Sequence, residues 1–152
     1  MIREVSIDHC LRASWQAVAK MYNEQASKHD STMAMAFVLL NIDYENGTPS
    51  TSLGPQMGME ATSLSRILKS MEDKKLIFRE PNPEDGRSIL IKLTALGKEK
   101  REVSKQSVIR FNQVIFENIS QEKIDHFIEV TQTITKLVNA KAIFNTVESK
   151  AI

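Results

Sequence analysis

The chain has 152 residues, of which 41% are hydrophobic and 26% are charged, and its formal net charge is +1. These values are ordinary for one soluble globular domain, and no apolar stretch is long enough to span a bilayer. The first ten residues lack the apolar core of a signal peptide, and the single cysteine excludes an intramolecular disulfide. A near-neutral charge argues against a protein that coats nucleic acid without sequence preference. We therefore expect a cytoplasmic, single-domain protein.

The first two predicted helices differ in how much of their surface is apolar. One begins after Ser6 and runs to about residue 26, with apolar side chains at helical spacing. The other begins after Ser31 or Thr32 and reads MAMAFVLLNI, which is apolar nearly all round. A helix without a polar face belongs in the core, so we expect the second helix to be buried.

Two further helices, separated by a glycine, follow the turn predicted at residues 46–49. Residues 50–57 predict a short helix, which we expect Pro55 to shorten or distort. Residues 60–74 predict a second helix with one apolar stripe: Leu64, Ile67, Leu68 and Met71. Short hydroxyls and charged side chains occupy the opposite face and its flanks: Thr62, Ser63, Ser65, Arg66, Lys69, Ser70 and Asp73.

A charged turn joins two short predicted strands, at about residues 77–80 and 88–93. We expect Arg87 at the apex of this turn, with Gly86 supplying the conformational freedom that a tight turn needs. Asp85 can stabilise the turn by pairing with Arg87 or with another nearby cation.

Two C-terminal helices complete the predicted order of elements. Thr94 begins a long helix to about residue 118, and Ser120 begins a last helix whose apolar face extends to Phe144. A helix-turn-helix followed at once by a two-stranded hairpin is a winged helix. The predicted fold class is therefore mainly α with a small β-hairpin wing.

The polar helix face and the wing together favour binding to duplex DNA. The major groove admits one α-helix, from which hydroxyls and cations reach phosphates and base edges, and a helix N-terminus favours anions. A narrow minor groove carries concentrated negative potential, which attracts an arginine such as Arg87. Residues 60–101 hold 10 Lys and Arg against 7 Asp and Glu, whereas the rest of the chain holds 10 against 12. The modest basic bias thus falls on the predicted DNA-binding segment.

Three short motifs carry a family resemblance: Leu76-Ile77-Phe78-Arg79 in a strand, Asp85-Gly86-Arg87 in the wing, and Leu93-Thr94-Ala95-Leu96-Gly97 at the entry to the next helix. Together with the polar-faced helix, they resemble the signature of the MarR family of bacterial transcription regulators. The close resemblance covers about residues 58–99, and the order of helices agrees over nearly the whole chain.

The resemblance to the MarR family implies one domain over residues 1–152, with a winged helix-turn-helix at about residues 31–93. It implies a homodimer whose dimerisation helices, about residues 5–28 and 94–146, interlock. The two winged helices would read a palindromic operator in double-stranded DNA. Such a protein would be a ligand-responsive repressor, with a small aromatic or lipophilic effector in a cleft between the dimerisation and DNA-binding parts.

The chain departs from the family pattern at two places. Lys75 stands where the family often has glycine, so this lysine must adopt a left-handed conformation or alter the end of the helix. The pair Gly54-Pro55 is unusual in the first helix of a helix-turn-helix. Both departures concern local geometry.

Cys10 invites comparison with the branch of this family that senses organic hydroperoxides through a cysteine near the N-terminus. That chemistry needs a thiolate stabilised by tyrosines, and the chain has only Tyr22 and Tyr44. We expect Cys10 to be packed among apolar side chains, with redox sensing as the alternative. Trp15, Tyr22 and Phe37 could line a ligand cleft, although apolar residues at helical spacing are more often core.

The sequence contains no nucleophile elbow, no phosphate-binding glycine loop and no paired carboxylates in a recognisable setting. Its three histidines are scattered without metal-ligand spacing. We therefore expect neither an enzyme nor a bound metal or cofactor. The alternative to a DNA-binding regulator is a winged helix used for protein–protein contact, which needs no cationic recognition face.

Overall fold

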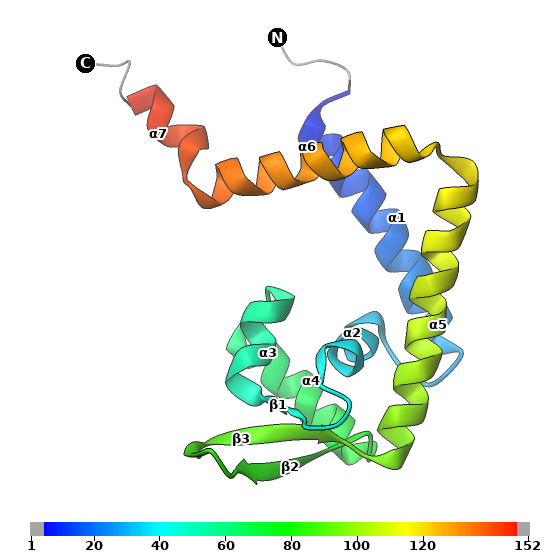
Figure 1. The fold of residues 1–152 in the computed structure, drawn as a ribbon, viewed down its shortest axis with the longest axis vertical. Coiled ribbons are helices and arrows are strands. Elements are labelled where there is room, and N and C mark those ends of the chain that lie inside the picture. Colours follow the sequence, from blue (N-terminus) through cyan, green and yellow to red (C-terminus); the bar gives the residue numbers. More distant parts are fainter. Residues whose placement is uncertain (1–4, 149–152) are drawn as a thin grey trace. The chain divides into compact units, whose positions relative to one another are not determined.

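The structure, a computed structural model, describes residues 5–148 and their side chains through residue 145 (Figure 1). These residues form seven helices and a three-stranded antiparallel sheet, which confirms the predicted mainly α fold class. The chain divides into two compact units, one ending at Val108 and the other beginning at Ile109. The outermost parts of the predicted domain, residues 1–4 and 149–152, lie outside the described residues.

Both N-terminal helices begin at predicted capping residues. Helix α1 (Ile7–Ser27) begins where the Ser6 hydroxyl accepts a hydrogen bond from the His9 backbone N–H at 3.4 Å. Helix α2 (Met33–Asn41) begins in the same way at Thr32, whose hydroxyl accepts a hydrogen bond from the Met35 backbone N–H at 3.2 Å. As predicted, α2 lies in the core, which it enters through three buried side chains: Met35, Val38 and Leu39.

The next two helices are those predicted around the glycine turn. Helix α3 (Ser50–Met57) has eight residues and contains Pro55, so it is short as expected. It ends at Gly58, whose φ of 63° is the left-handed conformation in which a glycine costs little. Helix α4 (Ala61–Asp73) follows, and its predicted apolar stripe faces the core through Leu64, Leu68 and Met71, with Ile67 half-buried.

The sheet has the strand order β1-β3-β2 and is antiparallel throughout. Strands β2 (Ile77–Asn82) and β3 (Asp85–Leu93) form the predicted hairpin and are both longer than predicted. Strand β1 (Thr48–Pro49) was predicted as part of a turn, and that prediction is wrong. Two residues are too few to show alternation in a sequence, and only their pairing with β3 makes them a strand.

The tip of the hairpin differs from the prediction. The turn consists of residues 83–84, and the register then changes abruptly, from Pro81 opposite Ile89 to Asn82 opposite Asp85. The β3 strand therefore has three extra residues, 86–88, that no β2 residue faces in the strand register, although the Asn82 amide donates to the Ser88 hydroxyl at 2.9 Å. Arg87 lies in this bulge and not at the apex of the turn.

The C-terminal segment also differs from the prediction, because the expected last helix is two helices. Helix α6 (Gln121–Asn139) follows Ser120, whose side chain makes no capping hydrogen bond. Lys141 adopts a left-handed conformation with a φ of 55°, which an α-helix cannot continue through. A separate helix, α7 (Ala142–Glu148), begins after it and contains Phe144.

The end of α4, the start of β2 and the start of α5 (Ala95–Asn118) meet in one junction. Lys75 follows α4 in a left-handed conformation with a φ of 59°, which is the first of the two outcomes expected for a lysine at this position. The Thr94 hydroxyl donates to the Lys75 carbonyl at 2.6 Å and accepts from the Gly97 N–H at 3.0 Å. The Thr94 N–H donates to the Leu76 carbonyl at 3.1 Å. A β-carbon at Gly97 would overlap that carbonyl oxygen, so the junction admits only glycine there.

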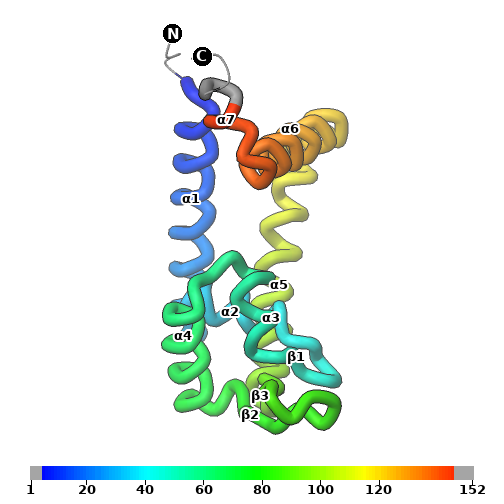
Figure 2. Tube along the Cα trace, turned by 90° about the vertical axis from the view of Figure 1, so that its left-hand side faces the viewer, coloured from blue at the N-terminus to red at the C-terminus, as the bar shows by residue number. Residues whose placement is uncertain are grey.

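The hydrophobic core of the first unit lies among α2, α3, α4 and the sheet (elements labelled in Figures 1 and 2). Its members come from every one of these elements: Met35, Val38, Leu39, Ile42, Leu53, Leu64, Leu68, Met71, Leu76, Ile77, Ile91 and Leu93. Because the α4 stripe is anchored in this core, the polar face of α4 is turned outward.

The junction generates a stability prediction. We expect Gly97→Ala to lower the free energy of unfolding by about 2–3 kcal/mol, because the added methyl group must displace the Leu76 carbonyl. Gly86→Ala is the matched control, because Gly86 is not at positive φ and a β-carbon there meets open space. We expect it to change stability by less than about 0.5 kcal/mol. Urea unfolding at one fixed protein concentration measures both, and equal losses would contradict the proposed fit.

Candidate nucleic-acid interface

The outward face of α4 carries five of the six residues predicted to contact DNA. All five side chains are exposed: Thr62, Ser63, Ser65, Arg66 and Lys69. By helical spacing, Thr62, Arg66 and Lys69 lie opposite the buried stripe, and Ser63 and Ser65 lie on its flanks. The N-cap residue Glu60 makes no side-chain capping hydrogen bond, so its carboxylate does not satisfy the first-turn N–H groups.

The sixth residue, Arg87, is exposed on the bulged part of β3. Asp85 accepts a hydrogen bond from the backbone N–H of Arg87 at 3.0 Å. The carboxylate thus holds the backbone of the wing, and it makes no ion pair with the Arg87 guanidinium within the described residues. The predicted role of Gly86 in a tight turn is wrong, because Gly86 lies in β3 without a positive φ.

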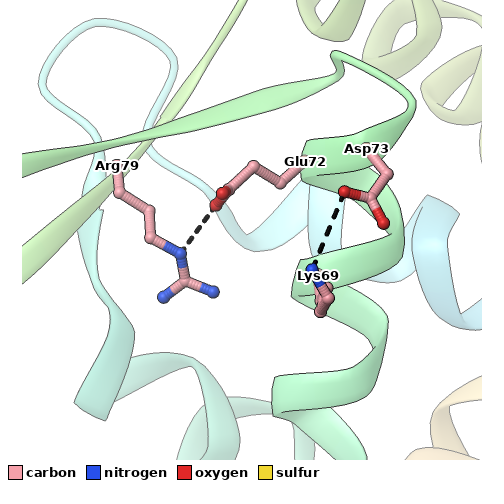
Figure 3. A network of polar contacts seen from close by, with 4 residues as sticks. All are labelled: Lys69, Glu72, Asp73 and Arg79. Carbon is pink, nitrogen blue, oxygen red and sulfur yellow. Dashed lines mark hydrogen bonds and ion pairs between the residues drawn. The ribbon is translucent and has the colours of Figure 1, made fainter.

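The charged side chains of α4 differ in whether they have partners (Figure 3). In the part of the chain that the structure describes, Arg66 makes no ion pair. Lys69 lies one turn before Asp73, with 3.9 Å between its Nζ and the carboxylate. Glu72 reaches sideways to β2, where its carboxylate lies 2.7 Å from Arg79 Nε.

Another ion pair connects the C-terminal end of α4 with the turn between α1 and α2. Lys74 Nζ lies 3.1 Å from the Asp30 carboxylate and 3.1 Å from the Asp30 carbonyl oxygen. Asp30 is one of the few non-glycine residues with positive φ, at 53°. Sequence reasoning missed this contact, because 44 residues separate the partners and neither position carries a motif.

A small cavity lies between α1, α2 and the part of α5 that belongs to the first unit. Tyr22 and Phe37 line it and pack edge to face, with ring centroids 5.8 Å apart. Burial raises the pKa of the Tyr22 phenol above its usual value. The third predicted residue, Trp15, does not line the cavity and is 53% exposed. The volume of about 40 Å³ has room for a few water molecules and is too small for an aromatic ligand.

The prediction that Cys10 is packed in apolar surroundings is wrong for the chain by itself, in which Cys10 is exposed. The apolar side chains at helical spacing on α1 did predict a helix, but no residue of α1 is buried. Among the described residues, no group of three or more His, Cys, Asp and Glu side chains is arranged to hold a metal ion. No helix in residues 5–148 is both long and apolar enough to cross a membrane.

Comparison with known proteins agrees with this geometry. The sequence profile of the MarR family matches residues 32–89, which include α4 and the wing arginine. The HTH-type transcriptional regulator SarZ of Staphylococcus saprophyticus is 26% identical over 126 residues, covering 83% of each chain. The uncharacterized HTH-type transcriptional regulator YdgJ of Bacillus subtilis is 31% identical over 102 residues, which are 66% of this chain and 62% of YdgJ. Over residues 32–89, the chain is therefore similar to the MarR family.

The fold of this chain is also that of solved structures. The MepR protein of S. aureus, solved in a complex with DNA, superposes with a TM-score of 0.77. At 19% identity, the likeness covers 90% of this chain and 99% of the MepR chain. It therefore extends the shared MarR-family fold beyond the 58 residues of the profile match, 32–89, to nearly the whole chain. The alignment with YdgJ spans less than two thirds of that relative.

Proposed function

We propose that this chain is a homodimeric transcription regulator of the MarR family that binds a palindromic operator in double-stranded DNA. It acts in the cytoplasm as a repressor that a small aromatic or lipophilic ligand releases. The observation that carries the proposal is the pair of exposed guanidinium groups, Arg66 and Arg87. One stands on the outward face of α4 and the other on the wing, and neither has an ion-pair partner in the described residues.

In the proposed complex, α4 enters the major groove. The groove admits one helix, and the exposed hydroxyls of Thr62, Ser63 and Ser65 can donate to phosphates or base edges. Arg66 is long enough to donate two hydrogen bonds to a guanine edge, which is a base-specific contact. The buried stripe of α4 fixes the rotation of the helix about its axis, so these side chains reach the DNA together.

The wing supplies a second contact, in the minor groove. Arg87 stands on a thin two-stranded hairpin, and the Asp85 carboxylate holds its backbone N–H. The guanidinium is left to interact with the negative potential of a narrow groove. Because minor-groove donors and acceptors are nearly the same for A·T and T·A pairs, this contact adds affinity more than sequence selection.

Exposed apolar side chains support the proposed dimer, and each unit contributes its own set. On α1, three residues between 41% and 64% exposed lie at helical spacing: Ile7, Leu11 and Trp15. On α6 and α7, seven large apolar residues are 43% or more exposed: Phe127, Ile128, Val130, Leu137, Val138, Ile143 and Phe144. So many exposed large side chains indicate a surface that another molecule covers. In a twofold-symmetric dimer the two α4 helices read two half-sites, which makes the operator palindromic.

The cavity between α1, α2 and α5 supports the proposed effector site, in a closed state. Its walls combine aromatic rings with polar groups of Lys100, Ser104 and His29, a lining that suits an aromatic molecule with one polar end. A ligand of that size needs a larger cavity than about 40 Å³, so its binding must separate these helices. A ligand that binds only the opened state shifts the population toward it, and the DNA-binding geometry with it.

Two other functions are less well supported. A winged helix used for protein–protein contact needs no cationic face, so it does not account for the exposed cations of α4. Redox sensing through Cys10 gains from the exposure of the thiol, but Tyr22 lies twelve residues further along α1, which is about 18 Å at the rise of an α-helix. Both remain distinguishable by the experiments below.

The two arginines generate the central prediction. Arg66→Ala is expected to cost about 1–3 kcal/mol of binding free energy on a specific duplex and to relax one position in each half-site. Arg87→Ala is expected to weaken binding to all sequences and to reduce the salt dependence by about one phosphate contact. The probes are a duplex that the protein selects from a random pool and a scrambled duplex of the same composition, each titrated at two salt concentrations.

Neither arginine substitution should change the melting temperature, because both side chains point away from the core. Failure of the protein to enrich any duplex from the pool would refute DNA recognition. Full affinity after Arg87→Ala would show that the wing does not contact DNA.

The exposed face of α6 generates a prediction about assembly. We expect a mass in solution of twice 17.2 kDa by light scattering at micromolar concentration. Phe127→Asp places a charge on the apolar face and should yield monomers, because burying an unpaired carboxylate is costly. Gln132→Asp adds the same charge five residues further along the helix, on its polar side, and should leave the dimer intact. A monomeric unsubstituted protein would contradict the proposed assembly.

The exposed thiol generates a prediction about oxidation. Peroxide treatment is expected to leave DNA binding unchanged, because Cys10 has no partner in the described structure that would stabilise a thiolate. Binding is compared before and after treatment for the unsubstituted protein and for Cys10→Ser. Release of DNA that disappears in Cys10→Ser would establish the redox-sensing alternative.

A further inference from the structure

Two adjacent carboxylates in the last turn of α4 point to different partners, as Figure 3 shows. Glu72 lies against Arg79 of β2, at 2.7 Å, and both side chains are about half exposed. Asp73 lies 3.9 Å from Lys69 of the same helix, and these two side chains are 68% and 78% exposed. The Glu72 carboxylate therefore binds the wing strand, and the Asp73 carboxylate faces solvent beside Lys69, a predicted DNA contact.

Asp73 shares the outward face of α4 with the side chains proposed to meet DNA. Residues 62, 66, 69 and 73 are spaced by four, three and four positions, which places them in one row along a helix. At the rise of an α-helix, Asp73 lies about 10 Å beyond Arg66 along the axis. The outward face thus carries hydroxyls and cations along most of its length and an anion at its C-terminal end.

An anion at this place weakens the attraction between the helix end and a phosphate backbone. The Asp73 carboxylate offsets the charge of Lys69 for any phosphate that approaches the pair from solvent. The negative end of the α4 dipole acts in the same direction. Glu72 has a smaller effect, because its charge is turned toward Arg79 and away from the outward face.

We propose that Asp73 is a specificity-determining residue, which suppresses sequence-independent binding by offsetting the charge of Lys69. Binding then depends on the contacts that Arg66 and the hydroxyls make further along the same face. Glu72 is a positioning residue, which holds β2, and through it the wing, against α4. This inference rests on the proposed function, because it needs the outward face of α4 to lie against DNA.

The two carboxylates provide a matched experiment. Asp73→Asn and Glu72→Gln each remove one negative charge from neighbouring positions of one helix turn. If only the net charge of the protein mattered, both variants would bind all DNA more tightly. The proposal predicts opposite results, and the probes are again the duplex selected from a random pool and its scrambled counterpart.

Asp73→Asn is expected to tighten binding to the scrambled duplex by about fivefold at 0.15 M salt, the gain from one additional phosphate contact relative to 1 M salt. The slope of log affinity against log salt steepens by about 0.9. The selected duplex gains no more than the scrambled one, so discrimination does not improve. Glu72→Gln weakens binding to the selected duplex, because the wing loses its anchor, and does not tighten binding to the scrambled one.

Two further variants test whether the tighter binding of Asp73→Asn to scrambled DNA depends on Lys69. Lys69→Met in the Asp73→Asn background should remove the gain, because no cation then remains at that end of α4 to meet a phosphate. Lys69→Met alone should weaken binding to scrambled DNA, because it leaves the Asp73 carboxylate without its cation. Arg79→Met should reproduce the loss seen in Glu72→Gln, and combining the two should add nothing further. Melting temperatures within about 3 °C of the unsubstituted protein show that the fold is retained.

The outcomes separate this inference from the proposed function. If the unsubstituted protein binds no duplex, the proposed function fails. If it binds a selected duplex while Asp73→Asn changes neither the affinity for scrambled DNA nor the salt slope, the inference about Asp73 is wrong. Equal tightening in Asp73→Asn and Glu72→Gln would also overturn it, because net charge would then explain both.

Discussion

The position of every proposed DNA contact depends on the junction in which α4 ends and α5 begins. The Thr94 hydroxyl and N–H bind two successive carbonyls of the α4–β2 link, and the absence of a side chain at Gly97 lets α5 approach that link. Lys75 keeps this arrangement in spite of a left-handed backbone, a conformation that costs about 1–2 kcal/mol in a residue with a β-carbon. A displacement of α5 is therefore transmitted to both α4 and the wing.

In the first unit, carboxylates neutralise some of the cations, and the cations that remain unpaired are available to attract a partner. The described ion pairs are all partly or largely exposed, so each contributes little to stability. Their effect is to decide which charges remain available to a partner. Lys69 and Arg79 are paired with carboxylates, while Arg66 and Arg87 are not. A chain with a net charge of +1 can in this way present two unpaired guanidinium groups, one on α4 and one on the wing.

Local signals were predictable from the sequence, and contacts between distant segments were not. Helix starts at Ser6 and Thr32 and the outward face of α4 follow from capping chemistry and helical period, which a few neighbouring residues determine. The bulge around Arg87 depends on the register between strands, and the exposure of Cys10 depends on whether another element covers α1. The same limit applies to the candidate site, where the side chains were predicted but their ion-pair partners were mostly not.

The contact between Asp30 and Lys74 constrains the number of residues in the α1–α2 turn. Surface turns commonly tolerate inserted residues, because nothing depends on their path. Here both the carbonyl and the carboxylate of a left-handed residue must reach the last turn of α4. One added residue would rotate or displace Asp30, and the end of α4 would lose its tie to α1. Within this family fold, variation in the length of that turn and variation at the Lys74 position should therefore be linked in evolution.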